Sequence, residues 1–199
     1  MSQRSSLRMG LVLASTLVAL AGCAKAHETS SSACPPEPGD VRPVDQVLLA
    51  WLSKARTLHH LADLAEEQGS IDEAIRRLEE LVGGTLPGGR PPEAAEVMAD
   101  TYARIAELRT RRGDYERADQ AIVSGLAYAP GPTYFRGHLL EVRGLVYEKQ
   151  SGDFEKAGRA SDAKQAREKA LSANVEAVRI QDEVIKSTLG DAGGPTKRE

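Results

Sequence analysis

Apolar residues recur at every third or fourth position through most of the chain, which places them on one face of an α-helix. No stretch has the sustained apolar/polar alternation that is typical of a β-strand. The pattern predicts an all-α fold with helices over residues 44–68, 71–82, 92–112, 115–129, 133–150 and 154–189. Glycine and proline mark the breaks between them, most densely at residues 83–91 and 130–132.

The last predicted helix changes character along its length. Its second half carries an apolar stripe of Leu171, Val175, Val178, Ile185 and Leu189. Its first half has small residues instead, at positions Ala157, Ala160, Ala163, Ala166 and Ala170. We expect this long helix to cover the exposed end of the helices before it.

Two segments of the chain resemble each other when Gly69 is aligned with Gly113. The segment Gly69–Ala74 then lies over Gly113–Ala118. Leu58, Leu61 and Ala62 lie over Tyr102, Ile105 and Ala106, and Leu78 and Leu81 lie over Ile122 and Gly125. A weaker third copy has Leu140, Gly144 and Tyr147 before a turn at Gly152–Ala157. The copies span residues 55–87, 99–132 and 137–175.

This pattern resembles the tetratricopeptide repeat, which has a large residue, a Leu and a small residue in its first helix, then a Gly turn, an aromatic, an Ala and a closing Pro. The second copy has these residue types at Tyr102, Ile105, Ala106, Gly113, Tyr115, Ala118, Ile122 and Pro130. The first copy keeps the small residues but has Leu58, Ile71 and Leu78 in place of aromatics. The resemblance implies antiparallel helical hairpins stacked as a short superhelix with a long C-terminal helix. A generic bundle of helical hairpins is the alternative.

The resemblance also implies a concave groove, lined by the first helix of each hairpin, that holds a peptide or helix of a partner protein. By alignment, its lining would be Arg56, His59, Asp63, Glu66, Asp100, Ala103, Glu107, Arg111, His138, Glu141, Leu145 and Lys149. This lining carries both signs of charge, so a polar partner segment is expected.

The N-terminus has the pattern of an export signal. Arg4 and Arg8 precede an uncharged, mostly apolar run over residues 9–21, which is shorter than the about 20 residues that a membrane-spanning helix needs. The segment Leu20-Ala21-Gly22-Cys23 resembles the lipobox of bacterial lipoproteins, which implies that residues 1–22 are removed and Cys23 carries lipid. Ala24 in the next position implies transport to the outer membrane. An ordinary signal peptide with an incidental cysteine is the alternative.

The remaining segments divide into a tether, one helical domain and a tail. Residues 23–43 are rich in Ser and Pro and are expected to be a disordered tether, with the helical domain over 44–189 and a disordered tail over 190–199. Cys34 lies in the tether, either as an unpaired residue or in an intermolecular disulfide. The signal contains two basic residues and no acidic ones, so its removal changes the formal net charge from −3 to −5. That acidity argues against nucleic acid as a partner.

Catalytic signatures are absent from the sequence. No phosphate-binding loop, nucleophile elbow or paired-His metal motif occurs, and no cofactor is expected. The pairs His59 with Asp63 and His138 with Glu141 each share a helix face, which leaves a metal site as an alternative to an ordinary solvated face.

Three functions follow in order of preference. The first is a lipid-anchored adaptor that binds a protein or peptide in the cell envelope and helps to assemble or stabilise an envelope complex, without enzymatic activity. The second is a self-assembling structural lipoprotein that forms a homo-oligomer through the Ala-rich face of the last helix. The third is a metal-dependent enzyme that uses the histidines.

Overall fold

The computed structural model describes residues 45–192, all of whose regular secondary structure is helical. The helices are α1 (Gln46–Glu67), α2 (Ile71–Val82), α3 (Pro92–Arg111), α4 (Tyr115–Leu126), α5 (Tyr134–Lys156) and α6 (Ala160–Ala192). The predicted all-α class is therefore confirmed. The predicted signal and tether, and residues 193–199 of the predicted tail, lie outside the described residues, whereas residues 190–192 continue α6.

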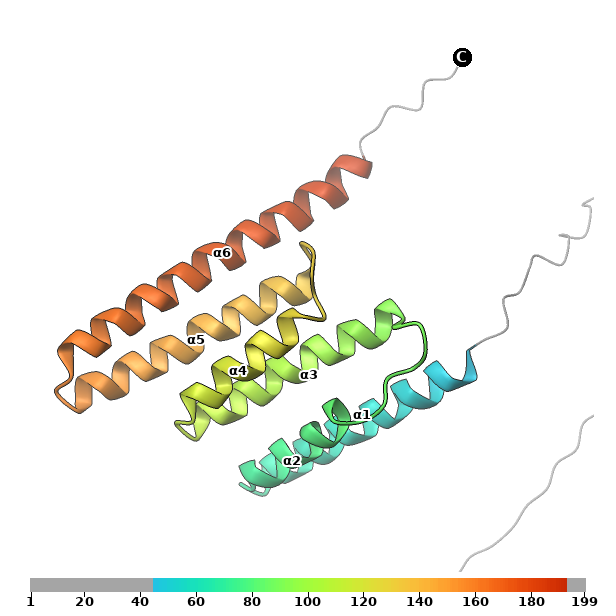
Figure 1. Ribbon diagram of the computed structural model, residues 1–199, viewed down its shortest axis with the longest axis horizontal. Coiled ribbons are helices and arrows are strands. Elements are labelled where there is room, and N and C mark those ends of the chain that lie inside the picture. Colours follow the sequence, from blue (N-terminus) through green and yellow to red (C-terminus); the bar gives the residue numbers. More distant parts are fainter. Residues whose placement is uncertain (1–44, 193–199) are drawn as a thin grey trace, which may run out of the picture. The chain divides into compact units, whose positions relative to one another are not determined.

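The helices pack as three consecutive antiparallel pairs, α1 with α2, α3 with α4, and α5 with α6 (Figure 1). Helix α3 also packs against α2 and α5, and so joins the first hairpin to the third. Within the described part of the chain, α6 packs against α5 alone. The last hairpin therefore ends the series with one side of α6 unpartnered.

The three hairpins turn in the same way. Gly69, Gly113 and Gly158 have φ angles of 73°, 75° and 72°, in the left-handed region that favours glycine. In the first turn, the amide of Gly69 donates to the carbonyl of Glu66 (2.8 Å) and that of Ser70 donates to Ala65 (2.8 Å). The other two turns repeat both bonds, which together form the Schellman motif that terminates a helix.

The third turn lies at Gly158, and the predicted turn at Gly152 is wrong. Gly152 is a helical residue of α5, which continues to Lys156. The hydroxyl of Ser151 donates to the carbonyl of Ala163 (2.9 Å), and this contact across the hairpin requires the later turn. Two glycines six positions apart could each end the helix, so packing between α5 and α6 selects the second.

The corrected turn places a small residue at the same point of every hairpin. Seven residues before the turn glycine stand Ala62, Ala106 and Ser151, all buried. Five residues after it stand Ala74, Ala118 and Ala163, also buried. Because these side chains are small, the two helices of each hairpin can approach closely. Ser151 stands at the equivalent position in the third hairpin, and the predicted Gly144 also lies where α5 approaches α6 closely, against Asn174.

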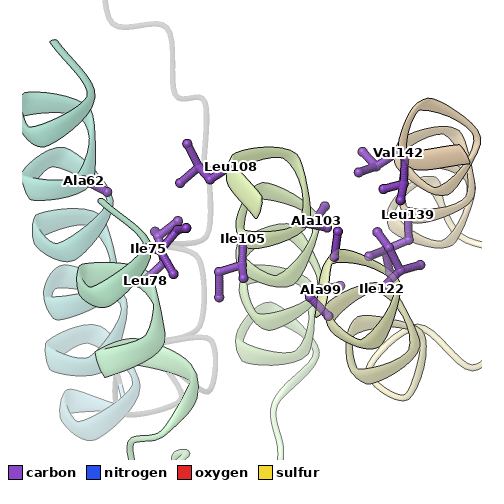
Figure 2. Packing of buried hydrophobic residues seen from close by; sticks show 14 of the residues in the cluster. Ala62, Ile75, Leu78, Ala99, Ala103, Ile105, Leu108, Ile122, Leu139 and Val142 are labelled. Carbon is purple, nitrogen blue, oxygen red and sulfur yellow. The ribbon is translucent and has the colours of Figure 1, made fainter. Parts of the chain in front are cut away.

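The core runs continuously from the first hairpin to the third (Figure 2). Leu78, Ile105, Ile122 and Leu139 are among its largest wholly buried side chains, and they come from α2, α3, α4 and α5. Figure 2 shows Ile105 and Leu108 of α3 on the side of the first hairpin, and Ala99 and Ala103 on the side of α4. Helix α3 is therefore buried on more than one face.

The apolar stripe predicted for α6 is not part of this core. Leu171, Val175, Val178, Ile185 and Leu189 are 54–67% exposed. The buried face of α6 consists instead of Ala163, Ala166, Ala170, Ala173, Ala177 and Ile180. Small side chains on that face let α6 lie close to α5, where Gly137 and Gly144 face Gln181 and Asn174. The requirement for close approach therefore outweighs the larger hydrophobicity of the other stripe.

Candidate partner-binding groove

A groove of about 1120 Å³ runs across the first helices of the three hairpins. Seven of the twelve residues predicted for a groove line it: Glu66, Asp100, Glu107, Arg111, His138, Leu145 and Lys149. They come from α1, α3 and α5, and the turn ends of α2 and α4 add Ile71 and Tyr115. No residue of α6 contributes to the lining.

The other five predicted residues lie elsewhere. Arg56, His59 and Asp63 line a separate, shallow depression on α1. Ala103 is wholly buried in the core and cannot line a surface groove. Glu141 is exposed, but its carboxylate accepts a hydrogen bond from the side-chain amide of Gln181 (2.6 Å) and so is turned towards α6.

Arg104 is a central lining residue that the sequence reasoning missed. Its guanidinium forms ion pairs with Asp63 and with Glu66, whose Oε1 accepts at 2.6 Å. The repeat alignment, which pairs Ala103 with His59, assigned Ala103 to the lining in place of Arg104. Steps of four, three and four residues along one helix face nevertheless connect Asp100, Arg104, Glu107 and Arg111. That spacing is the signal that could have identified it.

The ion pairs of Arg104 connect α1 to α3 at one wall of the groove. Arg111 adds a second contact to Glu66, at 2.5 Å. Burial alone would raise the pKa of Glu66, but hydrogen bonds from Arg104 and Arg111 outweigh it and lower the pKa. Burial disfavours the charge of Arg104, whereas Glu66 and Asp63 favour it and raise its pKa overall. This wall is therefore charged and internally paired at neutral pH.

Glu107 differs from the paired wall. It is half-buried on α3, and burial raises the pKa of its carboxyl group, while electrostatic interactions with His138 and Arg104 lower it less. Among residues 45–192, no side chain is hydrogen-bonded or ion-paired to Glu107. A half-buried carboxylate in this state gains free energy when a cationic or hydrogen-bond donor group reaches it.

Tyr115 and Asp153 are two lining residues of the groove that contact each other. The Tyr115 hydroxyl donates to Oδ2 of Asp153 at 2.5 Å, which joins the start of α4 to α5. Burial and this hydrogen bond raise the pKa of Tyr115 to about 12. Lys156 approaches the same carboxylate at 2.9 Å. The groove lining thus contains two sets of paired charges, around Arg104 and around Asp153, in addition to Glu107.

His59 has a structural partner rather than a metal-binding arrangement. Its Nε2 lies 2.9 Å from Thr101 Oγ1, and the Thr101 hydroxyl donates to the carbonyl of Val97 (2.6 Å). Because that hydroxyl has one hydrogen, Nε2 of His59 is the donor in the first bond. Burial lowers the pKa of His59, which favours this neutral form. The Nε2 lone pair is then absent, so this atom is not placed to bind a metal.

His138 stacks against Tyr134 with ring centroids 6.1 Å apart, and its Nδ1 lies 3.6 Å from Glu141. Within residues 45–192, no three His, Cys, Asp or Glu side chains gather closely enough to coordinate a metal ion. The predicted pairs His59–Asp63 and His138–Glu141 are therefore not extended into larger clusters in the described part of the chain.

Comparisons of the chain with models of known protein families, with curated proteins and with solved structures found no match. Among the helices of the described residues, none combines the length and the apolar character that crossing a membrane requires.

Proposed function

We propose that the protein is a lipid-anchored adaptor of the cell envelope whose helical hairpins stack in the manner of tetratricopeptide repeats. The groove across α1, α3 and α5 binds a polar segment of a partner protein, and the protein is not an enzyme. The observation that carries this proposal is the half-buried carboxylate of Glu107, which lines the groove without a hydrogen-bond or ion-pair partner in the described part of the chain.

The lining supports a peptide with both charged and apolar residues. Glu107 fits a Lys or Arg side chain, because a charge-assisted hydrogen bond offsets the cost of burying the carboxylate. Lys149 is exposed at the same groove and fits an acidic residue, while Leu145, 37% exposed, offers an apolar contact. A volume near 1120 Å³ exceeds that of typical small-molecule pockets and suits an extended or helical segment.

The repeated turns support the stacking proposal. Three Schellman turns with glycine in the left-handed region stand 44 and 45 residues apart, and each is flanked by small buried residues at the same offsets. The tetratricopeptide period is 34 residues. The breaker-rich segment 83–91 and the segment 127–133, with its two prolines, lengthen the connections between hairpins and account for part of the longer period.

The envelope location rests on the sequence of residues 1–24, which lie outside the described residues. The order of positive residues, apolar run and Leu20-Ala21-Gly22-Cys23 supports export, lipid attachment at Cys23 and retention at the periplasmic side of the outer membrane. A lipid anchor followed by a Ser/Pro-rich tether would leave the helical domain free to reach a partner.

Chemical cross-linking in intact cells, followed by affinity capture of the full chain, tests the proposal. We expect a discrete set of envelope proteins with the native chain, and a loss of about tenfold in their recovery with Glu107→Lys, since a charge reversal worth 1.4 kcal/mol has that effect. Glu96→Lys is the matched control because Glu96 is exposed on the same helix and does not line the groove.

Circular dichroism of both variants establishes that the helices still form. Equal recovery with Glu107→Lys and Glu96→Lys would contradict binding in the groove. Recovery of no envelope protein above background with the native chain would contradict the adaptor function itself.

A further inference from the structure

The outer face of α6 carries an apolar stripe, interrupted at Asp182, that no other part of residues 45–192 covers. Leu171, Val175, Val178, Ile185 and Leu189 form it, and their side chains are 54–67% exposed. At 1.5 Å per residue the stripe extends for about 27 Å along the helix. Single exposed apolar residues are common on protein surfaces, but a contiguous run of large ones marks an interaction site.

The spacing of the stripe is that of a coiled-coil seam. With Asp182 included, the positions step by four, three, four, three and four residues from Leu171 to Leu189. This alternation keeps side chains on one line of a helix that packs against another helix at a shallow angle. The face of α6 that packs on α5 carries Ala163 to Ala177 and lies about a third of a turn away around the helix, so the seam is available in the folded chain.

A lipid surface is a poor occupant for this stripe. An interfacial helix needs a polar face rich in Lys and Arg to attract anionic lipid head groups. Around the stripe, Arg179 and Lys186 are offset by Glu176, Asp182 and Glu183. The face therefore has no excess of positive charge.

A second copy of α6 in antiparallel orientation fits the stripe along its whole length. When the two helices are centred at residue 180, Leu171 meets the other copy's Leu189, and Val175 meets the other copy's Ile185. Val178 then meets the other copy's Asp182. Every seam position is thus matched by another seam position, as a two-fold interface requires.

Charge selects the antiparallel pairing over the parallel one. In a parallel pair in register, Asp182 would face Asp182 of the other copy within the seam, and like charges there are destabilising. In the antiparallel pair each Asp182 lies beside the other copy's Arg179. Arg179 is already paired with Glu183 at 2.5 Å on its own helix, and its side chain is 58% exposed, so it can reach a second carboxylate.

We propose that the protein forms a two-fold symmetric dimer through this stripe, with the two α6 helices antiparallel and centred near residue 180. This inference goes beyond the adaptor function and does not depend on it. It replaces the Ala-rich face as the surface for self-association, because Ala163, Ala166 and Ala170 are buried against α5. Since no residue of α6 lines the groove, the dimer would carry two open grooves.

Disulfide trapping in cells that produce the full chain tests the orientation. Two full-length chains are co-expressed, one with Leu171→Cys and the other with Leu189→Cys, both with Cys34→Ser to remove the thiol in the predicted tether. We expect an oxidant to yield a disulfide-linked heterodimer, and little dimer when either variant is expressed alone. A chain with only Cys34→Ser measures any contribution from Cys23.

The two single-variant controls separate the orientations. Leu171→Cys alone would cross-link efficiently in a parallel dimer but not in the antiparallel one, where the two positions 171 are about 27 Å apart along the helix. A strong homodimer of this variant overturns the proposal, and so does the absence of any heterodimer in the co-expressed pair.

A second measurement tests the surface without added cysteines. Sedimentation of the full chain under reducing conditions is expected to show a dimer that is weakened at least about tenfold by Val178→Glu with Ile185→Glu. Both side chains are exposed, so the helical circular dichroism should be unchanged. Gln165→Glu, an exposed change ahead of the stripe on the same helix, should leave the dimer intact. A monomeric native chain, or a dimer equally stable in all variants, overturns the proposal.

Discussion

Gly125 of α4 lies so close to Tyr102 of α3 that a Cβ atom at position 125 would stand 2.9 Å from the Cβ of Tyr102. The same atom would stand 2.7 Å from Cδ2 of Leu139 in α5. Both distances are shorter than van der Waals contact allows. Helices α3, α4 and α5 therefore meet at a point where only glycine fits.

Replacing Gly125 with Ala should destabilise the fold by about 1 kcal/mol. Overpacking costs about 1–3 kcal/mol, and the gain in helix propensity returns about 1 kcal/mol of it. Gly152→Ala is the matched control. Gly152 also lies within a helix, but a Cβ atom added there would have no neighbouring atom within 4 Å. That control should stabilise the protein by about 0.5–1 kcal/mol. Urea unfolding measures both, and equal effects at the two positions would contradict the packing.

Arg104→Ala should reduce stability by about 1 kcal/mol at neutral pH, because it leaves Asp63 and Glu66 without their shared partner. Arg76→Ala, which removes an exposed pair with Glu73 on one helix, should change stability by less than about 0.5 kcal/mol. Chemical unfolding at pH 7 and at pH 3 provides the measurement.

The pH dependence of this effect has a defined sign. The arginines lower the pKa of Glu66 in the folded state, so its contribution is present above the ordinary Glu pKa of about 4.3 and is lost as the pH falls through the folded value. The difference between the native chain and Arg104→Ala should therefore shrink at pH 3. A difference that stays constant would show that the ion pairs do not contribute.

Glu107→Gln should raise the melting temperature at neutral pH. Burial raises the pKa of Glu107 in the folded state, so its charged form opposes folding as the pH rises above about 4.3. The variant and the native chain should converge below that pH, where both side chains are neutral. Glu96→Gln removes the same charge from an exposed position and should have little effect. A melting temperature that Glu107→Gln lowers would indicate a favourable partner for this carboxylate.

Much of the helical pattern could be predicted from periodicity and breakers alone. Helix α2 has the predicted limits Ile71 and Val82, and α3 begins at the predicted Pro92. Glycine at the end of a periodic stretch identified the turns at Gly69 and Gly113. These features are local, so the sequence contains them directly.

The position of the third turn and the exposed face of α6 could not be predicted from the sequence pattern. Gly152 and Gly158 both suit a turn, and the choice depends on Ser151 meeting Ala163 across the hairpin. Periodicity likewise identified the apolar stripe through Leu171 and Val175 but not which face packs, and close packing on α5 buries the alanine face instead. Both outcomes depend on contacts between helices, which a one-dimensional pattern does not contain.

The lining of the groove was likewise predicted only in part. The repeat alignment placed Asp100, Glu107 and Arg111 in the lining, and all three line the groove. Arg104 was missed because the repeat alignment favoured Ala103, which is buried. The alignment followed sequence offsets from the turn, whereas exposure depends on which helices pack around α3.

Cys23→Ser should abolish membrane attachment of the chain. The lipobox resemblance places the lipid on the thiol of this residue, and serine offers no thiol for the transfer. Metabolic labelling with a radioactive fatty acid should label the native chain and Cys34→Ser but not Cys23→Ser. Equal labelling of Cys23→Ser would contradict a lipid anchor at this position.

A photo-cross-linking amino acid in place of Leu145 tests the central claim most directly. Leu145 lies in the groove, whereas Val123, 54% exposed on α4, lies outside it and serves as the control position. In intact cells, we predict a discrete cross-linked product from position 145 that is absent from position 123 and is lost when Glu107→Lys is added. Products that are the same from both positions, or that persist with Glu107→Lys, would contradict partner binding in the groove.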